Sequence, residues 1–315
     1  MKVLVTGAGG FVGEYLVRLL LDHGHELQAM GIGNGAFLEE LGIPAHEVDI
    51  CNAGAVQVCM SAVCPDAVIH LAAISNVPMS WQHPGRTIDV NIRGTVNVLQ
   101  ALAEVNPSGR FLNIGSSDEY GLTAKSGAPL SEDMPCLPQN PYSISKYCAE
   151  QMALQIGKQR GVKVIQTRSF NHFGPGQAKG FVTSDFASQI AAMERGDKPP
   201  VLHVGDLSAC RDFTFVADVV AAYAALIEKD VPGGVYNICS GRARSMEDIL
   251  RELVSLSSLS ISIEQDPERM RLSEVPYFIG NAEKLKAATG WKPKYSFSQG
   301  MGEVLDYWRR KAAAV

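Results

Sequence analysis

Short, continuous apolar segments alternate with helical patterns along the first half of the chain. Apolar runs of strand length are typical of strands buried on both faces of a parallel sheet, whereas apolar residues spaced three and four apart indicate one face of a helix. The alternation predicts an α/β fold with a doubly wound parallel sheet. The predicted strands are residues 2–6, 26–30, a short segment ending near 50, 67–71, 110–115 and 162–168.

The regular alternation ends after residue 168. The remaining sequence has shorter elements separated by polar loops, as expected of a smaller lobe that closes over a substrate. Helices are predicted over 181–195, 218–227, 246–256 and 302–310, with extended segments at 205–215, 235–239 and 261–264. We expect one domain from 1–168 plus about 212–240, and a smaller α/β substrate-binding lobe from about 169–211 plus 241–315.

A glycine-rich turn lies between the first strand and the first helix. In a dinucleotide site one glycine permits the tight turn, one lets the backbone approach the pyrophosphate, and one allows close packing of helix on strand. The helix N-terminus then offers free N–H groups to the phosphates. The turn predicts a Rossmann cofactor site formed by Gly7, Gly10, Phe11, Val12 and Gly13.

The end of the second strand bears on which cofactor is preferred. It has neither the acidic residue that binds an NAD ribose nor a basic residue for the 2′-phosphate of NADP. Because no carboxylate repels that phosphate, we expect NADPH, with NADH as the alternative. Asn34 is a candidate for the ribose and Asp49, with Ile50, for the adenine. The small residues after the fourth strand, Leu71, Ala72 and Ala73, would let the cofactor lie against the sheet.

Tyr142 and Lys146 stand four residues apart in a segment with a helical pattern, so they share one face of a helix. A nearby ammonium favours the phenolate, and a tyrosine pKa lowered by two to three units from ~10 suits proton transfer near neutrality. A surface helix with an ordinary Tyr and Lys would show the same spacing. The glycine turn, and Ser116 at the carboxyl end of the fifth strand, favour a catalytic role for all three residues.

A long helix is predicted over residues 81–105. Asn91 lies on its otherwise apolar face. A polar amide among apolar residues needs partners, so we expect Asn91 to anchor a backbone kink or to order water near the site.

Composition excludes several other classes of function. A net charge of −5 and a pI near 5.8 argue against nucleic acid or an acidic membrane as partner. The sequence has no apolar run near the ~18 residues of a membrane span. Seven scattered cysteines indicate reduced thiols and a cytoplasmic protein, and the Cys and His spacings predict no metal site.

The glycine turn, Leu71-Ala-Ala73, Ser116 and the Tyr142–Lys146 pair together resemble the extended short-chain dehydrogenase/reductase family, over essentially the whole chain. Members of this group act on nucleotide sugars. Segments 168–183, 205–212 and 271–293 are similar to its GDP-sugar branch. The resemblance implies a homodimer, paired through the helices 81–105 and 142–160 of each subunit.

The resemblance also implies roles for residues. Ser116 and Tyr142 would hydrogen bond the C4 carbonyl oxygen of the sugar, and Tyr142 would give it a proton. Lys146 would hold the nicotinamide ribose and lower the tyrosine pKa. The GDP-sugar contacts would come from Ser75, Asp118, Asn171, Arg211, Arg271 and Glu274.

The activity implied is reduction of GDP-4-keto-6-deoxy-D-mannose to GDP-D-rhamnose with NAD(P)H. The alternatives are GDP-mannose 4,6-dehydration, a different sugar 4-reduction or epimerisation such as the one giving GDP-6-deoxy-D-talose, and a cofactor-binding sensor without turnover. Dehydratases carry Glu and Thr where this chain has Asp118 and Ser116. A shift of about 1 Å in a proton-transfer group can cost on the order of 10²-fold, which disfavours elimination. A sensor would typically lack Tyr142 or Lys146, and both are present.

Overall fold

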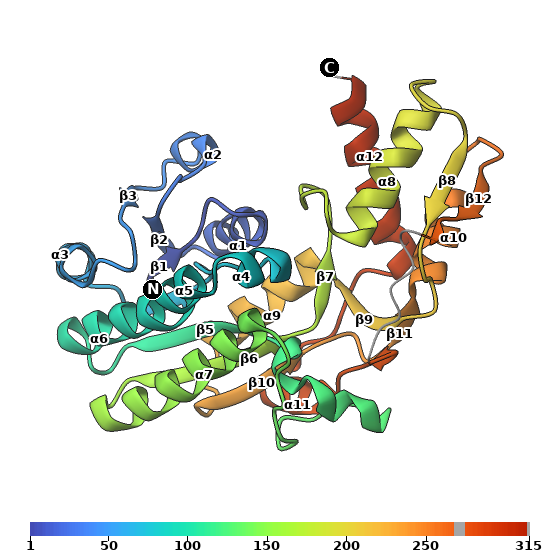
Figure 1. Ribbon diagram of the computed structural model, residues 1–315. Coiled ribbons are helices and arrows are strands. Elements are labelled where there is room, and N and C mark those ends of the chain that lie inside the picture. Colours follow the sequence, from blue (N-terminus) through green and yellow to red (C-terminus); the bar gives the residue numbers. More distant parts are fainter. Residues whose placement is uncertain (268–274, 314–315) are drawn as a thin grey trace.

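The computed structural model describes residues 1–267 and 275–313. Its centre is a seven-stranded parallel sheet in the order β10-β6-β5-β4-β1-β2-β3 (Figure 1). Strand order reverses direction at β1, between β4 and β2, which confirms the predicted doubly wound sheet. The strands are β1 (Lys2–Thr6), β2 (Glu26–Gly31), β3 (Ala45–Glu47), β4 (Ala67–His70), β5 (Arg110–Ser116), β6 (Lys163–Ser169) and β10 (Gly234–Ile238).

Helices cover both faces of this sheet because its strands are apolar on both faces. Val3 and Val5 of β1 belong to one hydrophobic cluster, whereas Leu4 between them belongs to a second cluster on the opposite face. The first cluster is covered by α1 (Phe11–Asp22), α2 (Ala36–Glu40), α9 (Val216–Glu228) and α11 (Glu283–Thr289). The second is covered by α3 (Ala53–Val63), α6 (Thr95–Val105) and α7 (Pro141–Arg160).

The prediction of one helix over 81–105 is wrong in its first half. The segment forms α4 (Val77–Gln82), α5 (Pro84–Ile88), a π-helical stretch over Asp89–Gly94, and then α6. The break falls at His83, whose φ of −132° and ψ of 61° are not helical. The ring of Pro84 disfavours the helical conformation for the residue before it, which is the physical reason for the break.

The second lobe packs around a third hydrophobic cluster. It contains the predicted helices, observed as α8 (Val182–Glu194), α10 (Met246–Ser255) and α12 (Phe297–Ala313). A small sheet of β7 (Asn171–Phe173), β9 (Cys210–Phe215), β11 (Ala243–Ser245) and β13 (Tyr277–Phe278) joins the lobes, and β8 (Val201–Val204) pairs with β12 (Ser262–Gln265). Strand β7 is not among the elements predicted from the sequence. In the described part of the chain, none of the helices has both the length and the apolar character needed to cross a bilayer.

Candidate active site

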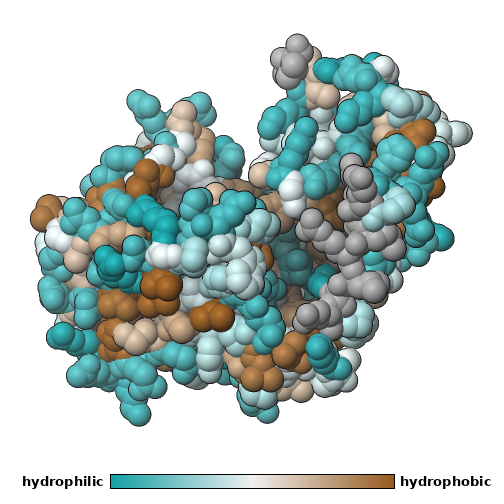
Figure 2. All heavy atoms as spheres, in the orientation of Figure 1, coloured by the Kyte–Doolittle hydropathy of each residue, from teal (hydrophilic) through white to brown (hydrophobic). Residues whose placement is uncertain are grey.

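A cleft of about 960 Å³ lies at the carboxyl edge of the central sheet, and Figure 2 shows a hollow between the two lobes. Loop segments after β6 and β7 close its second side. Most of the predicted site residues line it: Gly7, Gly10, Phe11, Val12, Gly13, Asn34, Asp49, Ile50, Leu71, Ala72, Ala73, Ser75, Ser116, Asp118, Tyr142, Lys146 and Asn171. The fold therefore brings together residues from the whole first half of the chain and from β7.

The glycine turn has the shape that a pyrophosphate requires. Gly7 has a positive φ of 68°, and a Cβ there would lie 2.8 Å from the backbone nitrogen of Ala72. A Cβ on Gly13 would lie 2.2 Å from the carbonyl oxygen of Ala8, so only glycine allows α1 to pack this closely on β1. No side chain caps the start of α1 at Gly10. Its N–H groups therefore remain available to an anion, which fits a dinucleotide cofactor.

Two charged residues that the sequence did not indicate lie near the far end of the cleft. Arg86 of α5 lines it, and its Nη2 is 3.4 Å from Oδ2 of Asp49. Glu47, at the end of β3, accepts a hydrogen bond from the backbone nitrogen of Gly33. Asn34 lies beside Glu47: its Nδ2 is 3.5 Å from Oε2 of Glu47 and donates to the carbonyl oxygen of His46. Arg86 is far from β2 in sequence, so only the packing of α5 beside the sheet reveals a cation here.

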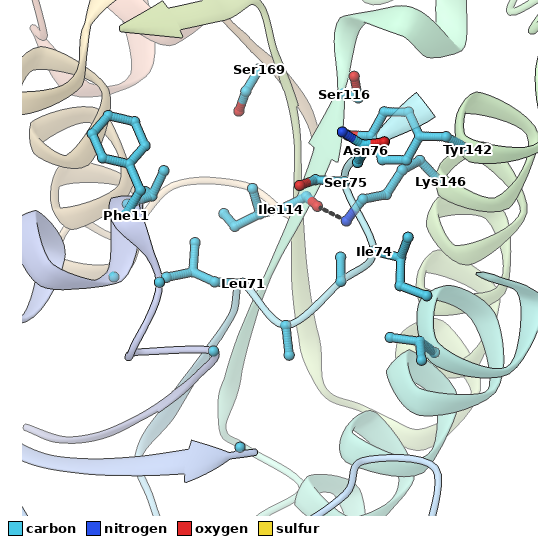
Figure 3. A pocket seen from close by; sticks show the side chains of 18 of the residues that line it. Phe11, Leu71, Ile74, Ser75, Asn76, Ile114, Ser116, Tyr142, Lys146 and Ser169 are labelled. Carbon is cyan, nitrogen blue, oxygen red and sulfur yellow. Dashed lines mark hydrogen bonds between the residues drawn. The ribbon is translucent and has the colours of Figure 1, made fainter. Parts of the chain in front are cut away.

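Tyr142 and Lys146 lie in the first turns of α7. Asn140 caps this helix: its Oδ1 accepts from the backbone nitrogen of Ser143, and Oγ of Ser143 accepts from the backbone nitrogen of Asn140. Both Tyr142 and Lys146 are buried. Figure 3 shows Tyr142 next to Ser116, and Lys146 reaching back to donate a 2.8 Å hydrogen bond from Nζ to the carbonyl oxygen of Ile114 in β5.

Asn91 links α7 to the loop that follows β4, whereas the sequence had suggested that it anchors a backbone kink or orders water. Its side chain, in the π-helical stretch, exchanges two hydrogen bonds with the backbone of Ile74 at 2.8 and 3.0 Å. The same Nδ2 donates to Oγ of Ser145 at 2.9 Å. Asn91 therefore holds the loop after β4 and the N-terminal part of α7 in a fixed relation.

The protonation states differ from the expectation. Burial and the charge of Asp118 raise the pKa of Tyr142 above its usual value, although hydrogen bonding with Ser116 opposes this shift. The prediction that Lys146 lowers the tyrosine pKa is wrong for this structure, because its ammonium is directed to Ile114. Burial lowers the pKa of Lys146 itself to about 8, with the carboxylate of Glu119 opposing.

The turn after β5 sends its two carboxylates in opposite directions. Asp118 lines the cleft, and burial raises its pKa while Arg211 opposes the shift. Arg211 belongs to β9. It does not line the cleft, but its charge interacts with Asp118, so it lies beside the cleft. Glu119 turns into the protein, where its Oε1 accepts from the backbone nitrogen of Ser116 at 2.7 Å.

Glu119 joins a buried ion-pair cluster behind the cleft. Both oxygens of Glu150 accept from the guanidinium of Arg168, at 3.0 and 2.7 Å. Oε2 of Glu119 lies 3.8 Å from Nε of Arg168, and it has no hydrogen-bond partner. Burial and the charge of Glu150 raise the pKa of Glu119 well above its usual value. One arginine thus serves two carboxylates. The remaining predicted residues, Arg271 and Glu274, lie outside the described residues.

Comparison with known proteins assigns the family. The family described as GDP-mannose 4,6 dehydratase matches residues 4–304. The chain belongs to this family. Over 310 residues it is 37% identical to GDP-6-deoxy-D-mannose reductase of Pseudomonas aeruginosa, with 98% of each chain covered. It is 31% identical over 291 residues to GDP-6-deoxy-D-talose 4-dehydrogenase of Aggregatibacter actinomycetemcomitans, with 92% of each covered.

Membership of the GDP-mannose 4,6-dehydratase family confirms the resemblance to extended short-chain dehydrogenases/reductases. Among solved structures, RMD from Pseudomonas aeruginosa in complex with NADPH matches with a TM-score of 0.87 and 35% identity, over 98% of this chain and 99% of that one. The shared fold and the full-length match support the cleft as the active site. The roles of individual residues in it stay predictions.

Replacing Glu150 with Gln should lower the free energy of unfolding by about 3 kcal/mol, because it leaves the Arg168 charge buried without its bidentate partner. We expect a value near the low end of the usual range, since Glu119 is close enough to replace Glu150 in part. Chemical denaturation checks this. Glu247→Gln removes the partner of Arg251 in an exposed pair and should change stability by less than about 1 kcal/mol. Equal effects of the two substitutions would contradict the prediction.

The pKa of Lys146 predicts a pH dependence. The pKa of about 8 lies below that of an ordinary lysine, so the ammonium is lost as the pH rises through 8. Because kcat/KM reports ionisations of the free enzyme, kcat/KM should fall roughly tenfold per pH unit above that value. Steady-state rates from pH 6 to 10, with circular dichroism to exclude unfolding, test this. A plateau that extends to pH 10 would show that Lys146 keeps its ordinary pKa.

Proposed function

We propose that this protein reduces the C4 ketone of GDP-4-keto-6-deoxy-D-mannose with NADPH and forms GDP-D-rhamnose. The observation that carries the proposal is the full-length match to a GDP-6-deoxy-D-mannose reductase in a chain whose Ser116, Tyr142 and Lys146 meet in one cleft. The similarity to a structure that holds NADPH supports the cofactor, with NADH as the alternative. Arg86 supplies positive charge at the end of the cleft where Asn34 and Asp49 lie, and Glu47 supplies negative charge nearby.

The protonation states support a reduction. NADPH, when bound, supplies the hydride that the C4 carbon receives. Tyr142 is positioned to protonate the developing oxyanion, and its raised pKa keeps the phenol protonated in the resting enzyme. The hydroxyl of Ser116 is a second donor for the same oxygen. We assign Lys146, whose Nζ donates to the carbonyl oxygen of Ile114, to binding the nicotinamide ribose.

The substrate contacts come from both lobes. We assign the hexose to the neighbourhood of Ser75 and Asp118, and the GDP moiety to Asn171, Arg211, Arg271 and Glu274. Arginine suits a diphosphate because its planar guanidinium can bind two oxygens at once. The domain division at residues 168, 212 and 240 belongs to this proposal, since it places the cofactor on one lobe and the nucleotide sugar on the other.

Two alternatives differ in chemistry. A reductase giving GDP-6-deoxy-D-talose would use the same residues, with the opposite face of the ketone turned to the cofactor. The similarity to a GDP-6-deoxy-D-talose 4-dehydrogenase is the observation that supports this alternative. A GDP-mannose 4,6-dehydratase needs a carboxylate beside the tyrosine for elimination. Asp118 occupies that place, one methylene shorter than Glu, so the reductase is favoured.

We further propose a homodimer in the cytoplasm. Five large apolar side chains are exposed on α4, α5 and α7, namely Met79, Trp81, Ile88, Ile144 and Met152, and hydrophobic side chains gather on this part of the surface in Figure 2. Exposed apolar patches of this kind mark contacts with a partner. All seven cysteines are free thiols, as is typical of a reducing compartment.

Purified protein given the GDP-4-keto-6-deoxy sugar should oxidise NADPH, and the H4 couplings in the NMR spectrum of the product should be those of rhamnose. Tyr142→Phe should lower kcat by at least 10²-fold while NADPH still binds, because only the proton donor is lost. H4 couplings typical of talose would instead identify the product as GDP-6-deoxy-D-talose. Formation of a keto sugar from GDP-mannose without added reductant would overturn the reductase, and full turnover by Tyr142→Phe would overturn the role of the tyrosine.

Light scattering should give a mass of about twice 33.9 kDa. Met152→Asp, on the proposed contact face of α7, should shift the protein toward monomer because it places a charge in an apolar contact. Val58→Asp is the matched control, since Val58 is 72% exposed on α3, away from that face. A monomeric wild type, or equal dissociation by both variants, would exclude this interface.

A further inference from the structure

Three potential metal ligands meet at the edge of the central sheet opposite the cleft. His23 follows the last residue of α1, His25 precedes β2, and Glu228 is the last residue of α9. His23 Nδ1 lies 2.6 Å, and His25 Nε2 lies 3.0 Å, from the same oxygen of Glu228, Oε1. The cleft is at the other end of α1, roughly 18 Å away for a twelve-residue helix. Nothing in the reduction of the sugar uses this group.

The arrangement stands out among the described residues. Within 1–267 and 275–313, it is the only group of three or more His, Cys, Asp or Glu residues whose ligand atoms converge, all within 4.8 Å of one another. The other imidazole–carboxylate contact described, between His203 and Glu264, is a simple pair at 3.8 Å. The three side chains are held by the ends of packed elements, so they need little ordering to act together.

We propose that His23, His25 and Glu228 bind a divalent transition-metal ion, with Zn²⁺ as the best match. Two imidazole nitrogens and one carboxylate oxygen are the protein ligands of a known class of zinc sites, in which the fourth position is open. Nitrogen ligands select against Mg²⁺ and Ca²⁺, which prefer oxygen. Zinc bonds of about 2.0–2.1 Å place neighbouring ligands roughly 3.3 Å apart. The two distances to Oε1 are slightly shorter, so small side-chain rotations would admit the ion.

The exposure of the ligands supports access by an ion. The side chains of His23 and Glu228 are 41% and 28% exposed, whereas that of His25 is 9% exposed and fixes one ligand against the fold. The open position therefore faces solvent. An ion here ties the C-terminal end of α1 to that of α9, two helices that pack on the same face of the sheet. Because the ligands come together only in the folded chain, binding stabilises the native state.

The test uses full-length protein freed of metal by a chelator. Titration calorimetry with Zn²⁺ should show one equivalent bound, Mg²⁺ should show none, and Zn²⁺ should raise Tm by several degrees. His23→Asn and Glu228→Ala, made separately, should each weaken Zn²⁺ binding at least tenfold and remove the rise in Tm. His203→Asn is the matched control and should behave as wild type. Circular dichroism and NADPH binding of each variant show that the fold is kept.

Three outcomes would overturn the proposal. Zinc binding that survives both His23→Asn and Glu228→Ala would place the ion elsewhere, on thiols such as the exposed Cys64. Absence of stoichiometric binding by wild type would exclude the site directly. Co²⁺ gives an independent readout, because a nitrogen–oxygen site lacks the intense thiolate charge-transfer band. Such a band at one equivalent would likewise overturn the assignment.

Discussion

The burial of charge between α7 and the sheet is the constraint on which the active site depends. Lys146, Glu150 and Arg168 are all buried there, and a buried charge is costly without partners. Lys146 finds one in the carbonyl oxygen of Ile114, and Arg168 in the two oxygens of Glu150. These contacts fix the rotation of α7 against β5 and β6. The direction in which Tyr142 enters the cleft follows from that rotation.

The turn after β5 is attached to the same buried charges. Glu119 binds the backbone of Ser116 and reaches toward Arg168, so the turn is attached to the buried ion pair. Its neighbour Asp118 is thereby directed outward, to Tyr142 and Arg211. Asp118, on which the proposed choice between reductase and dehydratase rests, is thus oriented by Glu119, which turns into the protein. The length of the Asp118 side chain, one methylene shorter than Glu, then bears on which proton transfers are within reach.

Helix α1 connects two sites of different chemistry. Its N-terminus, left uncapped after a glycine turn, offers backbone N–H groups to an anionic cofactor. Its C-terminus delivers His23 to the carboxylate of Glu228. Both properties arise because the helix packs tightly on the sheet and on α9. The same packing that excludes a Cβ at Gly13 fixes where the far end of the helix lies.

Features that depend on local spacing could be predicted from the order of residues alone. Apolar runs specified the parallel strands, the three glycines specified the cofactor turn, and four-residue spacing placed Tyr142 and Lys146 on one helical face. These patterns are reliable because each depends only on residues that lie close together along the chain. The helix break at His83 is also encoded locally, by Pro84.

Features that depend on residues far apart in the chain became visible only in the fold. Arg86 meets Asp49, Arg211 meets Asp118, and His23 meets Glu228 through packing of separate elements. The protonation states belong to the same class, because burial raised the pKa of Tyr142 where the spacing to Lys146 had suggested the reverse. Desolvation and long-range charge depend on which groups surround an atom in space, and a linear spacing does not contain that information.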